Sequence, residues 1–131
     1  MVGFHTDIEK ETLDNNFFRK VLFTGTYAQL VVMSLAPKEE IGMETHTTID
    51  QFFRFESGVG KAILNGEETE FKANDVLIVL AGTNHNIINT SETEPLKLYT
   101  IYSPPNHPAG TIHATKADAM MAEEVREGGS V

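Results

Sequence analysis

Short runs in which apolar and β-branched residues alternate with polar ones recur about every 8–12 positions along most of the chain, and turn-forming residues separate them. This spacing is typical of an all-β sandwich or barrel. The runs predict nine strands: Phe18–Thr24, Ala28–Ala36, Met43–Thr48, Gln51–Glu56, Lys61–Asn65, Glu68–Lys72, Val76–Leu80, His85–Asn89 and Leu96–Tyr102. Asn65-Gly66 tolerates the positive φ angles of a type I′ turn, so it predicts a tight hairpin between the fifth and sixth strands.

The two ends of the chain depart from this pattern. Residues 1–17 are mostly polar, and we expect them to form an arm that lies over the barrel or crosses to a partner subunit. Residues 104–115 include three prolines and predict an extended loop. Thr115-Lys-Ala-Asp118 has the form of a capping box and predicts a short C-terminal helix over 116–127. We therefore expect one domain over 1–131, with its barrel at 18–103.

Charge and composition narrow the classes of function. The 131 residues include 19 acidic and 10 basic side chains, which gives a formal net charge of −9. An acidic surface without a Lys/Arg-rich stripe repels phosphate backbones and anionic lipid, so we expect neither a nucleic acid nor a membrane partner. The first ten residues lack the pattern of a signal peptide, and the expected compartment is the cytoplasm. Because the sequence has no cysteine, any metal ion must be held by nitrogen and oxygen ligands.

Candidate chemistry lies in two polar clusters. Glu44 and His46 are two residues apart on one predicted strand, so their side chains point the same way, and Gln51 begins the next strand. His85 follows the turn at Gly82 in the second cluster. Since 39 residues separate His46 from His85, a site shared by both histidines requires a closed sheet.

The first cluster resembles the first motif of the cupin family, Gly-x5-His-x-His-x(3,4)-Glu-x6-Gly. Glu44 stands where that motif has its first histidine, and His46 matches the second. Gln51 stands where the motif has its glutamate, and Gly58 closes it. The resemblance covers about residues 20 to 103.

The second cluster resembles the second cupin motif, Gly-x5-Pro-x-Gly-x2-His-x3-Asn. Gly82, His85 and Asn89 match it, whereas Asn74 replaces the opening glycine and Leu80 replaces the proline. The resemblance implies a cupin barrel, which is a double-stranded β-helix or jelly roll built from two antiparallel sheets.

The resemblance also implies that Glu44, His46, Gln51 and His85 line the mouth of the barrel and bind one divalent metal ion. Mixed nitrogen and oxygen ligands suit Mn, Fe, Ni, Co or Zn, and ligand type alone leaves the identity of the ion open. For Gln51 the alternative is a half-buried amide that forms a hydrogen bond across the sheet. Asn89 is better explained as a residue at a strand end than as a ligand.

The whole chain resembles bacterial cupins often labelled mannose-6-phosphate isomerase, and a glutamine in the glutamate position also occurs in cupins that linearise unsaturated uronate sugars. These resemblances imply a metal-dependent isomerase that acts on a sugar or a sugar-derived small molecule. In such an enzyme Glu44 or His107 moves the proton while the metal polarises an oxygen. The few cations near the motifs weigh against a sugar phosphate.

Other interpretations stay open at this stage. Cupin folds also serve as iron-dependent dioxygenases and as binding modules without catalytic activity, so the fold does not fix the reaction. His107 and His113 belong either to a surface loop or to a lid that folds back over the barrel mouth. The arm, the aromatic edge strands and the terminal helix offer surface for burial between two copies, so we expect a homodimer.

Overall fold

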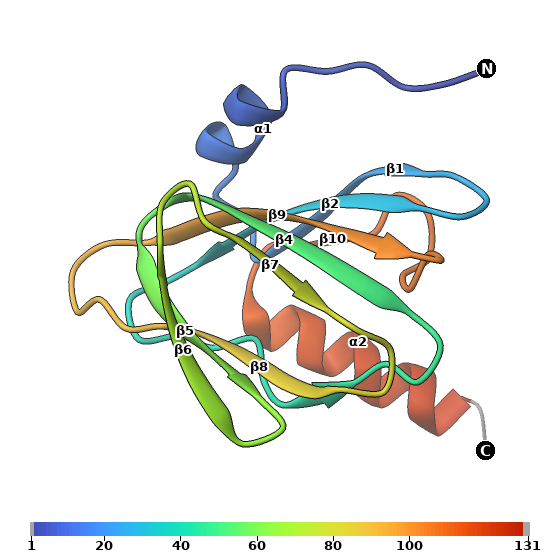
Figure 1. Ribbon diagram of the computed structural model, residues 1–131. Coiled ribbons are helices and arrows are strands. Elements are labelled where there is room, and N and C mark those ends of the chain that lie inside the picture. The colour runs from blue at the N-terminus through green and yellow to red at the C-terminus, as the bar shows by residue number, and fades with distance from the viewer. Residues whose placement is uncertain (1, 130–131) are drawn as a thin grey trace.

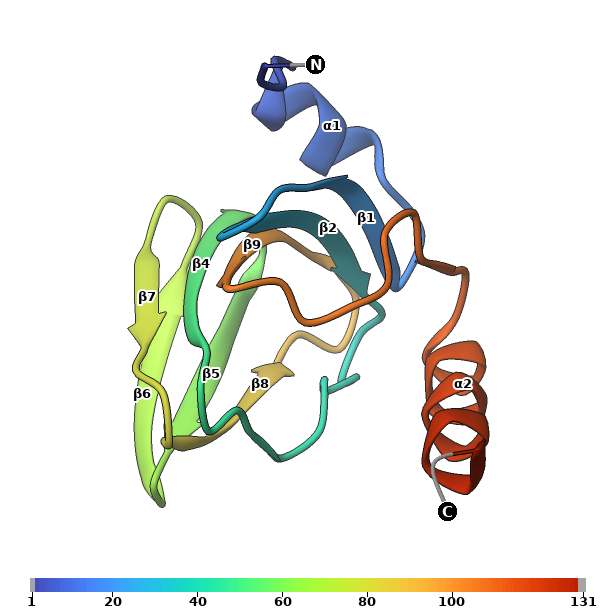
Figure 2. The ribbon, with the colours of Figure 1, turned by 90° about the vertical axis from the view of Figure 1, so that its right-hand side faces the viewer.

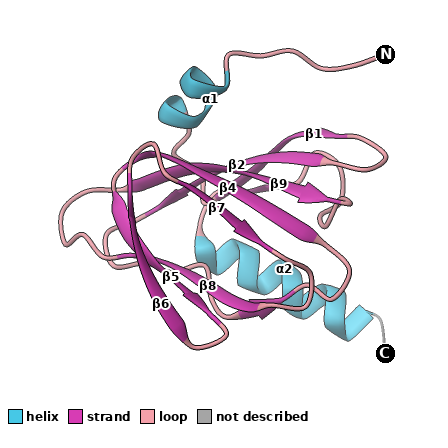
Figure 3. Cartoon of the chain, in the orientation of Figure 1, coloured by secondary structure: helices cyan, strands magenta, loops and turns pink. Residues whose placement is uncertain are grey.

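The predicted all-β barrel is present in the computed structural model, which describes residues 2–129 and the side chains of residues 2–123 (Figures 1 and 3). Each of the nine predicted strands overlaps one observed strand, and β10 is additional. The strands are β1 (Arg19–Thr24), β2 (Gln29–Leu35), β3 (Glu44–Thr45), β4 (Asp50–Ser57), β5 (Val59–Leu64), β6 (Glu67–Lys72), β7 (Val76–Val79), β8 (Asn84–Asn89), β9 (Leu96–Ser103) and β10 (Ile112–His113).

Two antiparallel sheets form the walls of the barrel. One has the strand order β10-β1-β2-β9-β4-β7 and the other has the order β3-β8-β5-β6. Figure 2 looks toward one end of the barrel, with β1, β2 and β9 above and β8 below. Because the chain passes repeatedly from one sheet to the other between β2 and β9, residues far apart in the sequence come to face one another across the interior.

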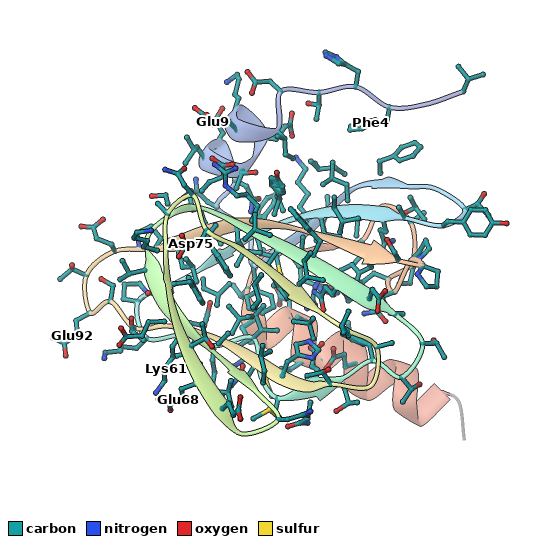
Figure 4. All side chains as sticks on the ribbon, viewed as in Figure 1. Phe4, Glu9, Lys61, Glu68, Asp75 and Glu92 are labelled. Carbon is teal, nitrogen blue, oxygen red and sulfur yellow. The ribbon has the colours of Figure 1, made fainter. Side chains whose placement is uncertain are left out.

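The Asn65-Gly66 hairpin predicted from the sequence is confirmed. Asn65 has a φ of 48° and Gly66 a φ of 86°, both in the left-handed region that a type I′ turn requires. The turn joins β5 to β6, and Lys61 and Glu68 on these two strands form an ion pair of 3.0 Å (Figure 4).

Alternation along the strands directs aromatic side chains into the core. Phe53 and Phe55 of β4 are 1% and 0% exposed, as expected for residues that share one face of a strand. Phe71 of β6 stacks on Phe55, with ring centroids 3.6 Å apart and an angle of 7° between the rings. Each buried phenylalanine contributes about 1.5–3 kcal/mol, so this stack between β4 and β6 helps to hold the two sheets together.

We predict that Gly60→Ala destabilises the protein by about 3 kcal/mol, because the added methyl group overpacks the core. A Cβ atom at Gly60 would run into the backbone oxygen of Ile88 and the ring of Phe71. The control is Gly3→Ala, since nothing lies within 4 Å of a Cβ atom built at Gly3. Urea denaturation measures both variants, and a Gly60→Ala protein as stable as the wild type would contradict the prediction.

The N-terminal arm contains a short helix that the sequence analysis did not predict, α1 (Ile8–Asp14). Asp7 caps it by accepting a hydrogen bond from the backbone N–H of Lys10, and Glu9 and Glu11 lie in the first turn, where they oppose the positive end of the helix. The helix packs on β2, β4 and β9. Ahead of it the chain runs along β1, where Phe4 stacks on Phe23 with ring centroids 5.0 Å apart (Figure 4).

The C-terminal segment contains the second helix, α2 (Lys116–Gly129). The predicted capping box is present, because Thr115 Oγ1 accepts from the N–H of Asp118 while Asp118 accepts from the N–H of Thr115. The helix ends two residues later than predicted, since glycine weakens a final helical turn without forbidding it. Within residues 2–129, no helix is long and apolar enough to cross a membrane.

Candidate functional site

The pairing of β3 with β8 brings the first two candidate ligands together. Glu44 and His85 are directly opposite each other in the antiparallel ladder, which places their side chains side by side. His46 follows β3 immediately, and its carbonyl accepts a 2.8 Å hydrogen bond from the N–H of Gly82 in the turn before β8. One ligand atom from each of Glu44, His46 and His85 lies within 4.8 Å of the other two, so the three could hold a metal ion.

Glu44 and His46 approach each other like two ligands of one ion. Glu44 Oε2 lies 2.9 Å from His46 Nε2, but the contact lacks the direction of a hydrogen bond. Among the described residues the buried Nε2 atom has no hydrogen-bond partner. Two ligands with bonds of about 2.1 Å at a right angle are about 3.0 Å apart, so the observed spacing fits a shared cation.

His85 is held in an orientation that suits metal binding. Its Nδ1 lies 2.9 Å from the carbonyl oxygen of Thr83, which can only accept, so Nδ1 carries the proton and Nε2 keeps its lone pair. Its ring packs edge-on against Phe53 and lies 5.4 Å from the ring of His46. A carbonyl that fixes the far nitrogen of a histidine is the usual support for a metal ligand.

Gln51 forms the hydrogen bond that one of the two interpretations predicted. Its Nε2 donates a 3.0 Å hydrogen bond to Thr100 Oγ1 on the neighbouring strand, which is the predicted bond within the sheet. Its Oε1 is buried without a hydrogen-bond partner in the described part of the chain. The amide oxygen of Gln51 could therefore serve as a further metal ligand inside the barrel.

The electrostatic environment keeps Glu44 ionised. Burial by itself raises the pKa of the Glu44 carboxyl, but the close contact with His46, the charge of Arg19 and the nearby His85 together outweigh that effect. The pKa therefore lies below its ordinary value of 4.5. Glu44 offers a carboxylate at neutral pH, which is the form that binds a cation.

The loop after β9 folds back and brings His107 into the barrel. Figure 2 shows this loop passing in front of β2 and β9 before the chain reaches α2. His107 is only 8% exposed, so it is not a surface-loop residue. Its Nε2 lies 3.3 Å from the hydroxyl of Tyr102, whose ring lies edge-on to His46 at 5.9 Å. Tyr102 therefore stands between His107 and the candidate ligands.

Gln29 fixes that loop, and the sequence analysis missed it. Its buried Oε1 accepts from the backbone N–H groups of Asn106 at 3.1 Å and His107 at 3.0 Å, and its Nε2 donates to the His107 carbonyl at 2.7 Å. Gln29 shares the inward face of β2 with Val31 and Met33. The sequence pattern could have identified Gln29, because it is a polar residue on an otherwise apolar strand face.

Arg19 is the second residue that the sequence analysis missed. It is 2% exposed, faces inward from β1, and its Nη1 donates to Nδ1 of His113 at 3.2 Å. His113 lies directly opposite Arg19 in the β1–β10 ladder, so it is part of a strand and not of a loop. The alternating burial pattern of β1 could have identified Arg19, because this arginine occupies a position that faces into the barrel.

Asn89, the last residue of the second motif, has a structural role. It is fully buried, and its Nδ2 lies within 3.1 Å of the backbone oxygens of Leu35, Ala36 and Glu94. Its Oδ1 accepts from the N–H of Ser91. These contacts hold the end of β2 and the loop between β8 and β9 together, as expected for a residue at a strand end.

We predict that Tyr102 makes the stability of the protein fall between pH 10 and 12. Burial raises the pKa of Tyr102 to about 12, and the charge of Glu44 adds to this, although Arg19 and Gln51 oppose it. In the unfolded chain the phenol ionises near 10.0, so the unfolded state loses a proton that the folded state keeps. The free energy of unfolding then falls by up to about 1.4 kcal/mol per pH unit.

Denaturation curves of wild type and Tyr102→Phe between pH 9 and 11.5 test this. In Tyr102→Phe, the free energy of unfolding is expected to fall less steeply with rising pH, because the contribution of Tyr102 is removed. Tyr27→Phe is the matched control, because Tyr27 is 82% exposed. If Tyr102→Phe keeps the wild-type slope, Tyr102 does not titrate as described.

A barrel of two antiparallel sheets that gathers two histidines and a carboxylate at one point defines a β-barrel protein with a candidate metal centre. The chain belongs to the cupin family, because the Cupin domain model matches residues 31–102. This confirms the family and the fold that the two sequence motifs implied.

Individual relatives agree with this assignment. The uncharacterised Bacillus subtilis protein YrkC is 48% identical over 127 residues, and the match covers 92% of this chain and 68% of that protein. The crystal structure of a Bacillus halodurans protein matches with a TM-score of 0.88 and 43% identity, over 90% of this chain and 93% of that chain. A Thermotoga maritima protein described as a predicted oxalate decarboxylase matches with a TM-score of 0.55 and 26% identity, over 59% of this chain and 66% of that chain.

Proposed function

We propose that this cupin binds one divalent metal ion through Glu44, His46, His85 and the amide oxygen of Gln51. The observation that carries the proposal is the pair of buried, unsatisfied atoms among the described residues, His46 Nε2 and Gln51 Oε1. A buried polar atom without a partner costs about 1–3 kcal/mol, and a cation bound by both atoms removes that cost. The ion is one of Mn, Fe, Ni, Co or Zn, which all accept mixed nitrogen and oxygen ligands.

We further propose that the metal-loaded protein is an enzyme of isomerase type that acts on a sugar or a sugar-derived small molecule. Such a reaction needs a polarised carbonyl oxygen and a group that moves a proton between neighbouring carbon atoms. In this proposal Glu44, His46 and His85 hold the metal that polarises the oxygen, and His107 moves the proton. Tyr102 lies between His46 and His107.

Each residue of the site has a separate role in the proposed reaction. A bound divalent ion supplies Lewis-acid polarisation of a substrate oxygen. His107 Nε2 lies 3.3 Å from the Tyr102 hydroxyl and 3.4 Å from Asn106 Nδ2, and these contacts orient the imidazole that moves the proton in this proposal. Tyr102 keeps its own proton because its pKa is raised to about 12, and it positions the His107 ring. The loop that carries His107 covers this part of the barrel and limits the entry of water.

The test is turnover by the loaded protein. Apoprotein and samples loaded separately with each of the five metals are incubated with a panel of aldoses, ketoses and uronates, and proton NMR follows the sugars. We expect interconversion only with metal, and His107→Gln should lower kcat by about 100-fold or more at unchanged metal content. His5→Gln is the control, because His5 is exposed in the arm. If no loaded sample converts any sugar, the isomerase proposal is wrong.

One observation favours a second candidate, an iron-dependent dioxygenase. Glu44, His46 and His85 are two histidines and one carboxylate, which is the ligand composition of many non-haem iron oxygenases. Oxygen uptake by the iron-loaded protein with a diketone or thiol substrate, together with no sugar conversion, would favour this activity. Metal binding with neither reaction would point to a binding module.

A further inference from the structure

Arg19 is a buried cation whose contacts in the structure are neutral. Its side chain touches the His113 imidazole and the Tyr102 hydroxyl, and no carboxylate of the described residues forms an ion pair with it. Its Nε is buried and has no hydrogen-bond partner within the described part of the chain. Glu44 acts on Arg19 only at longer range, so among the described residues no carboxylate lies in direct contact with the guanidinium. Burying a guanidinium without such a contact is costly, so the position favours an anion that binds beside it.

A cavity of about 360 Å³ lies beside this guanidinium, between the loop after β9, β10 and α2. This size suits a small-molecule ligand. The cavity is lined by Arg19, His107, Pro108, Thr111, His113, Met121, Ala122 and Glu123. Arg19 and His107 both touch Tyr102 as well, so the same two side chains border the cavity and the candidate metal centre.

The lining indicates a singly charged anion with a carbon skeleton. Among the described residues of the lining, Arg19 is the one arginine or lysine, and Glu123 opposes a second negative charge. His113 accepts from Arg19 through Nδ1, so that nitrogen offers no donor to an anion. A phosphate dianion needs more positive charge than this, whereas one carboxylate matches one guanidinium. Pro108, Met121 and Ala122 provide apolar surface for the rest of the molecule.

We propose that this cavity binds the carboxylate group of a small organic acid, with Arg19 as its counter-ion. Carboxylate binding by Arg19 is independent of the metal. That the acid is the substrate of the enzyme rests on the proposed function, and it narrows the sugar-derived substrates to those that carry a carboxylate.

The test compares acids with neutral molecules of the same skeleton. Glucuronate and lactate, which each carry one carboxylate, are titrated against glucose and lactamide, with inorganic phosphate as a separate arm, and the Nε–H signal of Arg19 is followed by ¹⁵N NMR. Arg19→Met identifies that signal by its loss. We expect at least one acid to bind at least tenfold more tightly than its neutral counterpart and to shift the Arg19 signal.

Two variants make the outcome specific. Arg19→Met is expected to weaken binding of the acid at least tenfold, with binding followed by calorimetry, while Lys20→Met on the other face of β1 leaves it unchanged. Equal binding of acids and neutral counterparts, no binding of either acid, tighter binding of phosphate, or full binding by Arg19→Met would each overturn the proposal.

The metal proposal and the carboxylate proposal can be tested separately. Metal-free wild type and His46→Ala are expected to bind the acid, and Arg19→Met is expected to keep its metal. Loss of metal binding alone therefore leaves the carboxylate site standing, and loss of acid binding alone leaves the metal centre standing.

Discussion

His46→Ala and His85→Ala are each expected to lower the affinity for divalent metal by about 100-fold or more. Each variant removes one of the three side chains whose ligand atoms lie within 4.8 Å of one another. Loss of a residue that only supports a metal ligand costs about 10–100-fold in other sites, so loss of a ligand should cost at least as much. Elemental analysis of the purified, dialysed proteins measures the effect.

The controls separate ligand loss from misfolding. His5→Ala removes an exposed histidine of the arm and should retain the wild-type metal content. Gln51→Ala should retain part of it, because a neutral amide is a weaker ligand than imidazole or carboxylate. Circular dichroism confirms that each variant keeps its β-structure. Full metal retention by folded His46→Ala or His85→Ala would refute the four-ligand arrangement.

Gln29→Leu is expected to destabilise the protein by about 3 kcal/mol and to release the loop that carries His107. The substitution leaves two backbone N–H groups and one carbonyl of Asn106 and His107 without their partner. Each such buried group costs about 1–3 kcal/mol, and detachment of the loop limits the total. Urea denaturation measures stability, and limited proteolysis with mass spectrometry detects cleavage within 104–111.

Gln29→Glu is the matched variant for this experiment. A carboxylate in the same place still accepts from both N–H groups but has no donor for the His107 carbonyl, so an intermediate loss is expected. A Gln29→Leu protein with wild-type stability and a protected loop would show that other contacts hold His107 in the barrel.

Period-two alternation predicted most of the barrel because one face of each strand is buried. Gln51, Phe53 and Phe55 illustrate this, since all three face inward from β4. The candidate metal group was predictable only through the family motifs. His85 lies 39 residues beyond His46, and no local pattern shows that β3 and β8 pair.

The parts that sequence reasoning missed depend on long-range contacts. A helix of seven residues is marginal by itself, and α1 gains support from Lys97, whose Nζ donates to the backbone oxygens of Leu13 and Asn15. Gln29 contacts His107 across 78 positions of the sequence. A polar residue on the inward face of a strand was visible, but its distant partner was not. The homodimer and the cytoplasmic location stay predictions.

Anomalous diffraction from crystals of the manganese- or cobalt-loaded protein tests the central claim most directly. We expect one strong peak within bonding distance of His46 Nε2, His85 Nε2, the Glu44 carboxylate and the Gln51 amide oxygen. A peak at other residues, or no peak between these four side chains in protein that carries one equivalent of metal, would contradict it.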